Sequence, residues 1–188
     1  MTSEPRLGID IGRVIIDGPA DSRADTGFFH GDEETMLSTP EMAGSFDAIR
    51  RLVARFDGRV WLVSKCGARV QARTERWLAA HDFFHRTGLP HDHVRFCRHR
   101  AEKRGHCEEL GLTHFVDDQP EVHKAIRGVV RYQYFFGPQR EAVPDYGIAA
   151  PTWTDVEWLV ARSLTVGEPG REAAGGDGTP ALDGHPDE

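Results

Sequence analysis

The segment RLGIDIGRVIIDG, residues 6–18, decides the fold. It begins with an apolar run from Leu7 to Ile11 that contains Asp10 near its end, and it then turns at Gly12. Strands in the middle of a parallel sheet are buried on both faces and have this continuous apolar character. A carboxylate is costly to bury without a partner. Asp10 at the end of such a strand therefore indicates a functional site.

Short apolar strands alternate with amphipathic helices along the rest of the chain. The expected strands after the first are 60–63, 93–97, 113–117 and 129–136. The expected helices are 39–56, 68–84, 101–111, 119–128 and 152–164, and Thr39 before Pro40 is suited to begin the first of them. This alternation predicts right-handed βαβ units, and thus a three-layer α/β/α, Rossmann-like parallel sheet.

Length and charge divide the 188 residues into one domain and a tail. Residues 167–188 contain six acidic residues, one arginine and nine glycines or prolines, a composition that cannot offset its ordering entropy and predicts a disordered tail. Residues 1–166 carry 22 basic and 24 acidic side chains, so they are nearly neutral. This balance makes general nucleic-acid binding an unfavoured function.

The chain has the features of a cytoplasmic protein. It has no run of 18 apolar residues that would predict a membrane span. Its first residues, MTSEPRLG, lack the basic and then apolar order of a secretion signal. Its three cysteines are an odd number without the spacing of a disulfide framework, which favours a reducing compartment.

Polar residues recur where the expected strands end. Asp10 ends the first strand, Ser64 follows the second, and Asp117 and Asp118 end the fourth, while Lys103 lies at the beginning of the helix after the third. The carboxyl ends of parallel strands meet at one edge of the sheet, where ligands bind in α/β folds. We therefore expect these side chains to form one site.

Three carboxylates at one edge repel each other unless a cation lies among them. Mg²⁺ fits this donor set, because it takes one or two carboxylates together with water and substrate phosphate. A lysine and a hydroxyl beside the metal would hold the oxygens of a transferring phosphoryl group. An aspartate oriented by these groups can attack phosphorus and form an aspartyl-phosphate.

Four segments together resemble the motifs of the haloacid dehalogenase-like superfamily, which consists mostly of phosphatases and phosphoryl transferases. GIDIGRVI resembles the first, VWLVS the second, HRAEKRG the third and FVDDQ the fourth, in the family's order over residues 7–137. The resemblance implies that Asp10 is the nucleophile and that Ser64 and Lys103 hold phosphate. It also implies that Mg²⁺ is bound by Asp10, the carbonyl of Gly12, Asp117 and Asp118.

One position departs from the family's pattern. The phosphatases of the family usually have a second Asp two residues after the nucleophile, as proton donor and base, where this chain has Gly12. Asp17, His30 or a group of the substrate could replace it, and the sequence singles out none of them. The resemblance therefore leaves three hypotheses. They are a Mg²⁺-dependent hydrolase of a phosphate monoester, a catalytically degenerate binding or regulatory protein, and an enzyme that cleaves a carbon–halogen or carbon–phosphorus bond.

The lengths of the insertions predict an open site. Residues 17–39 are polar and without a sustained period, so we expect mostly loop and only a small cap or lid. An open site suits a bulky, nucleotide-like substrate or a protein partner. Further anion-binding candidates beside the site are Lys65, Arg98 and Arg100. His91, His93, Cys97 and His99 suggest zinc, but their spacing matches no common tetrahedral motif.

Overall fold

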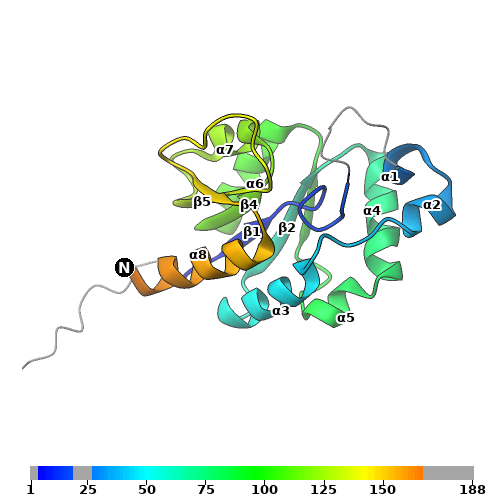
Figure 1. Cartoon of the computed structure of the whole chain (residues 1–188), viewed down its shortest axis with the longest axis horizontal. Coiled ribbons are helices and arrows are strands. Elements are labelled where there is room, and N and C mark those ends of the chain that lie inside the picture. Colours follow the sequence, from blue (N-terminus) through cyan, green and yellow to red (C-terminus); the bar gives the residue numbers. More distant parts are fainter. Residues whose placement is uncertain (1–3, 19–26, 167–188) are drawn as a thin grey trace, which may run out of the picture.

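A single parallel sheet forms the centre of the protein. The computed structural model describes residues 4–18 and 27–166. Six strands in this part of the chain form a sheet in the order β3-β2-β1-β4-β5-β6, and every neighbouring pair is parallel (Figure 1). The strands are β1 (Leu7–Ile9), β2 (Val60–Lys65), β3 (Val94–Cys97), β4 (His114–Asp117), β5 (Tyr132–Phe136) and β6 (Ile148–Ala150).

Helices cover both faces of the sheet, which confirms the predicted three-layer α/β/α fold. The helices are α1 (Gly27–His30), α2 (Glu33–Leu37), α3 (Ser45–Arg55), α4 (Ala68–Ala80), α5 (Phe83–Thr87), α6 (Lys103–Leu110), α7 (Pro120–Ile126) and α8 (Trp153–Val166). A short 3₁₀ turn, Arg100–Glu102, precedes α6. Helices α3, α5 and α8 lie on the opposite side of the sheet from α6 and α7 (Figure 1).

Alternation along β1 divides the core into two clusters. Leu7 and Ile9 pack with the buried residues of α3, α4, α5 and α8. Gly8 points to the other face, where a Cβ atom would lie 2.5 Å from the ring of Phe115. Only glycine therefore lets β1 approach the second cluster, to which α6 and α7 contribute their buried apolar residues.

The order of the strands reverses between β1 and β4. From β1 the chain adds β2 and β3 on one side of that strand. It then crosses back and adds β4 on the other side of β1. A crevice forms at the carboxyl ends of two such strands, and it is the usual ligand position in open α/β sheets. The residues that directly follow or end β1 and β4, Asp10 and Asp117, are both candidate site residues.

Several element boundaries differ from the predicted ones. Helix α3 begins at Ser45 and not near Thr39, because Gly44 adopts a positive φ of 76° and the preceding residues bond elsewhere. The N–H of Met42 donates to the carbonyl of Ile15, and Glu41 forms an antiparallel bridge with Ile16. Strand β2 continues to Lys65, so Ser64 lies inside the strand. Strand β6 was not predicted.

The region 27–41 contains α1 and α2 where mostly loop was expected, and side chains of α4 hold it in place. Arg69 donates to the carbonyl of Phe29 and Arg73 to those of Phe28 and Gly31, each at 2.7 Å. One turn further along the chain, the Trp77 indole donates to the carbonyl of Thr39 at 2.8 Å. After another turn, the His81 ring contacts the carbonyl oxygen of Leu37 at 2.9 Å. These hydrogen bonds hold the segment 27–41 against α4.

Two predicted features lie wholly or partly outside the described residues. The proposed disordered tail, residues 167–188, lies outside them, as does part of the predicted cap loop, residues 19–26. None of the helices in the described part of the chain has the length and apolar character that crossing a bilayer requires.

We expect His114 to make the fold sensitive to acid. Its ring is buried, and burial lowers its pKa from 6.5 to about 4. The unfolded chain therefore binds a proton more readily than the folded one. The free energy of unfolding consequently falls as the pH drops from 6.5 towards 4. The loss amounts to about 3 kcal/mol. Urea unfolding of His114→Phe and of the natural protein at pH 7 and pH 4.5 should show a smaller acid loss for the variant, and equal losses would contradict the assignment.

Candidate active site

A buried lysine joins the ends of β1 and β4. Lys103, the first residue of α6, places its Nζ 2.6 Å from Oδ1 of Asp10 and 2.7 Å from Oδ2 of Asp117. All three residues are buried, and Asp117 and Lys103 are at most 1% exposed. The sequence prediction that these residues meet at one edge of the sheet is thus matched by the geometry. A buried ion pair of this kind needs every charge to have a partner.

The third carboxylate of the group has its own cation. Asp118 forms an ion pair with Arg13 and accepts a hydrogen bond from the Gln119 side-chain amide at 2.6 Å. The side chain of Asp118 is 13% exposed and that of Arg13 is 30% exposed, so this pair lies nearer to solvent than the Lys103 pair. The site therefore has a buried floor at Lys103 and an accessible rim at Arg13.

The three carboxylates are close enough to share one cation. One oxygen from each of Asp10, Asp117 and Asp118 lies within 4.8 Å of the other two. Within the described residues this is the only such grouping of three or more acidic, histidine or cysteine side chains. Carboxylate oxygens are the donors that Mg²⁺ prefers, and the donor set therefore fits this metal.

The electrostatics of the cluster show how strongly these charges interact. Burial raises the pKa of Asp10 from 3.8 to about 6, the charge of Asp117 adds to this, and Lys103 opposes it. Burial and the charges of Asp117 and Asp10 raise the pKa of Asp118 to about 7 against the influence of Arg13. Burial lowers the pKa of Lys103, but the two carboxylates raise it by more, so the ammonium stays charged. A divalent cation would relieve the remaining repulsion.

Backbone and side-chain bonds hold Asp117 rigidly. Its Oδ1 accepts from the backbone N–H of Gln119 at 2.8 Å, and its carbonyl contacts the ring Nε2 of His123 at 2.9 Å. His123 is fully buried on α7, and its ring stacks on Phe135. This support fixes the carboxylate before any ligand binds, which is the arrangement that efficient catalysis requires.

The predicted phosphate-binding residues lie around this edge at different depths. Ser64 is buried near the end of β2, and its hydroxyl forms no hydrogen bond with any described residue. Lys65, Arg98 and Arg100 are exposed at the ends of β2 and β3, without an ion pair to other described residues. Ser64 therefore has a free hydroxyl donor. Lys65, Arg98 and Arg100 form a separate, solvent-exposed group of cations.

Arg13 was not among the predicted site residues. It directly follows Gly12 in a tight turn, in which the carbonyl of Ile11 accepts from the N–H groups of Ile15 and Ile16. Arg13 adopts a positive φ of 60°, a conformation that usually favours glycine. The only sequence signal was a charged residue in a turn after the candidate nucleophile, and that signal is weak.

The zinc alternative is not supported. The His93 ring stacks on Trp61 and contacts the carbonyl of Val60 at 2.9 Å, and the His91 ring stacks on Phe84. The thiol of Cys97 donates to the carbonyl of Ser64. These side chains are used in packing, and none of them belongs to a metal-binding group within the part of the chain that the structure describes.

Comparison with known proteins places the fold. No family model and no curated protein matches this sequence. Two similar solved structures are haloacid dehalogenase-like hydrolases, from Xanthomonas campestris and from Burkholderia xenovorans LB400. The first is 14% identical with a TM-score of 0.58 over 86% of this chain and 96% of its own. The second is 14% identical with a TM-score of 0.59 over 87% and 99%. The chain therefore has the fold of the haloacid dehalogenase-like hydrolases.

Proposed function

We propose that this protein is a Mg²⁺-dependent phosphohydrolase in which Asp10 is the nucleophile. The observation that carries the proposal is the convergence of three carboxylates and a buried lysine at the carboxyl ends of β1 and β4. The resemblance of the four sequence motifs and the shared fold of two hydrolases agree with it. The favoured substrate class is a phosphate monoester, including nucleotide-like ones.

Asp10, Asp117, Asp118 and the carbonyl of Gly12 would hold the metal, which when bound neutralises charge on the phosphoryl oxygens. Lys103 fixes the Asp10 carboxylate at 2.6 Å and keeps it oriented for attack. The free hydroxyl of Ser64 is available to donate to a phosphoryl oxygen. The exposed Lys65, Arg98 and Arg100 would attract the anionic substrate to the open edge.

The transfer step needs little from the protein beyond position and charge. An oxygen of Asp10 attacks phosphorus, the bond from phosphorus to the leaving oxygen breaks, and an aspartyl-phosphate forms. Water then attacks the phosphorus of this intermediate and releases inorganic phosphate, which regenerates the carboxylate. Lys103 offsets one of the two negative charges of Asp10 and Asp117 in the resting site.

The test is phosphate release from a panel of phosphate esters, with added Mg²⁺ and with a chelator. We expect release that depends on the metal, because the carboxylate cluster repels an anionic substrate without it. Thermal stabilisation by Mg²⁺ without release of phosphate from any substrate would instead support the binding or regulatory alternative. Release of halide or of an aldehyde would support cleavage of a carbon–halogen or carbon–phosphorus bond.

A further inference from the structure

Two cations, Lys103 and Arg13, lie beside the carboxylates of the site, and neither is suited to protonate a leaving group. Lys103 is buried and bonded to two carboxylates. Arg13 is bonded to Asp118, and a guanidinium does not give up its proton in proteins. Asp118 pairs with Arg13, accepts a hydrogen bond from Gln119 and is one of the proposed metal ligands, so its carboxylate is already engaged.

Two buried side chains near the carboxylates, those of His123 and Cys66, do not fill this role either. His123 lies behind Asp117, fully buried, and contacts the carbonyl of Asp117 and the Gln133 side chain. The Cys66 thiol is desolvated and packed beside Cys97. At Gly12, a Cβ atom would have no neighbour within 4 Å, so the position beside the nucleophile is open space.

Arg13 is the charged group closest in sequence to this open position. Its backbone has a φ of 60°, which costs a non-glycine residue free energy. That conformation places the guanidinium on Asp118, whose carboxylate belongs to the cluster with Asp10. The side chain is 30% exposed, and a guanidinium has five N–H donors, so donors remain for a ligand after the bond to Asp118.

We propose that Arg13 receives the leaving group as an anion, and that the natural substrates are acyl phosphates or phosphoanhydrides. This inference rests on the proposed phosphohydrolase function and assigns it anhydrides of phosphate as substrates in place of monoesters. Carboxylate and phosphate are weakly basic leaving groups that need no proton from the protein. A guanidinium binds both with charge-assisted, two-point hydrogen bonds.

The bonds and charges of this reaction balance without an acid. The carboxylate of Asp10 forms a bond to phosphorus, and the electron pair of the breaking P–O bond leaves with the carboxylate or phosphate oxygen beside Arg13. Water then attacks the aspartyl-phosphate, the bond from phosphorus to Asp10 breaks, and the protons of the water leave with the phosphate. For an alkyl phosphate the same step would expel an alkoxide, a strong base.

The experiment compares kcat/KM for acetyl phosphate, aryl phosphates of graded leaving-group basicity and an alkyl phosphate. The ratio kcat/KM reports the first irreversible step, which is transfer to Asp10. We expect kcat/KM for acetyl phosphate to exceed kcat/KM for the alkyl phosphate by a factor of about 10²–10⁴. This factor is the acceleration that general acid catalysis would otherwise supply. Similar values across the series would overturn the inference and leave the phosphohydrolase function standing. Silence towards every substrate, acetyl phosphate included, would overturn the function itself.

Two variants test the roles of the two residues. Gly12→Asp fits the open space and should raise kcat/KM for the alkyl phosphate but not for acetyl phosphate. A parallel change for both would count against the inference. Arg13→Gln should lower kcat/KM for acetyl phosphate and steepen the dependence on leaving-group basicity, whereas Arg13→Lys should retain part of the activity. The exposed Arg50→Gln is the matched control. An unchanged dependence in Arg13→Gln would remove Arg13 from the leaving-group site.

Discussion

Asp10→Asn is expected to abolish phosphate release while leaving the protein folded. The amide oxygen of asparagine can still accept a hydrogen bond from Lys103, which also retains Asp117 as a partner. The amide is not a nucleophile, so no aspartyl-phosphate forms. Removing a group that acts directly in hydrolysis costs on the order of 10⁴–10⁶ in kcat.

The measurement is kcat with the best substrate of the panel, together with acid-quenched protein probed for phosphate bound at Asp10. The control is Asp47→Asn, because Asp47 is exposed on α3 and its ion pair with Arg50 is long, at 3.9 Å. A folded Asp10→Asn protein that still released phosphate at the natural rate would show that the nucleophile lies elsewhere.

Lys103→Met is expected to destabilise the protein as well as inactivate it. The ammonium lies between Asp10 and Asp117 in a buried position, and its removal leaves two uncompensated carboxylates. Breaking a buried ion pair from one side costs about 3–5 kcal/mol. The loss should shrink when Asp10→Asn is added to Lys103→Met, because one of the stranded charges is then absent.

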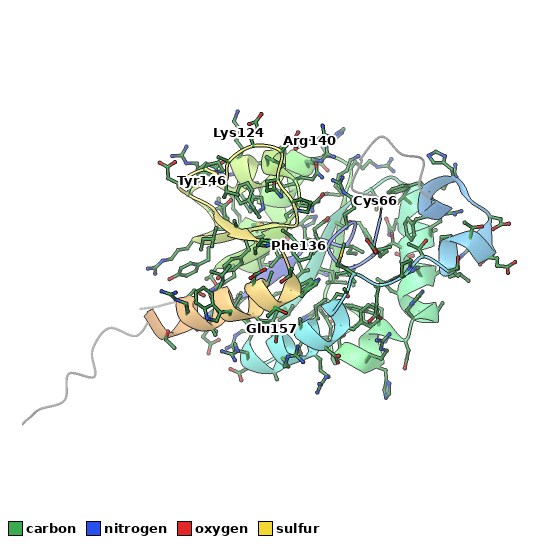
Figure 2. The ribbon with its side chains drawn as sticks, viewed as in Figure 1. Cys66, Lys124, Phe136, Arg140, Tyr146 and Glu157 are labelled. Atoms are coloured by element: carbon green, nitrogen blue, oxygen red, sulfur yellow. The ribbon has the colours of Figure 1, made fainter. Side chains whose placement is uncertain are left out.

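Urea unfolding of the metal-free proteins at pH 7 measures this difference. Lys124→Met is the matched control, because Lys124 is exposed on α7 (Figure 2) and should change the free energy of unfolding by no more than about 0.5 kcal/mol. Equal unfolding free energies for Lys103→Met and Lys124→Met would show that the buried charges are neutralised in another way.

The expected effects of the two substitutions differ because the residues have different tasks. The hydrogen bond that Asp10 accepts from Lys103 can also be accepted by an amide oxygen, so the charge of Asp10 matters mainly for chemistry. Lys103 has two carboxylate neighbours within 2.7 Å, so its charge matters for the integrity of the buried cluster. A comparison of stability and activity in both variants therefore separates the catalytic group from the group that positions it.

The sequence alone determined the sheet and the placement of the main site residues. The apolar run before Asp10 and the repeated alternation of strands and helices were sufficient to predict a parallel sheet. Parallel strands end at one edge, so Asp10, Lys103 and Asp117 were expected to meet there, and Lys103 does bond to both carboxylates. These features depend on short-range patterns, which a single sequence contains in full.

The tertiary structure alone decided how the turns and the rim of the site are built. The positive φ of Arg13 and the contact of its guanidinium with Asp118 depend on a partner 105 positions away. The late start of α3 depends on the backbone hydrogen bond from Met42 to Ile15. The position of residues 27–41 depends on hydrogen bonds from side chains of α4. Local propensity carries no information on such distant partners, because their free energy arises only when the chain has folded.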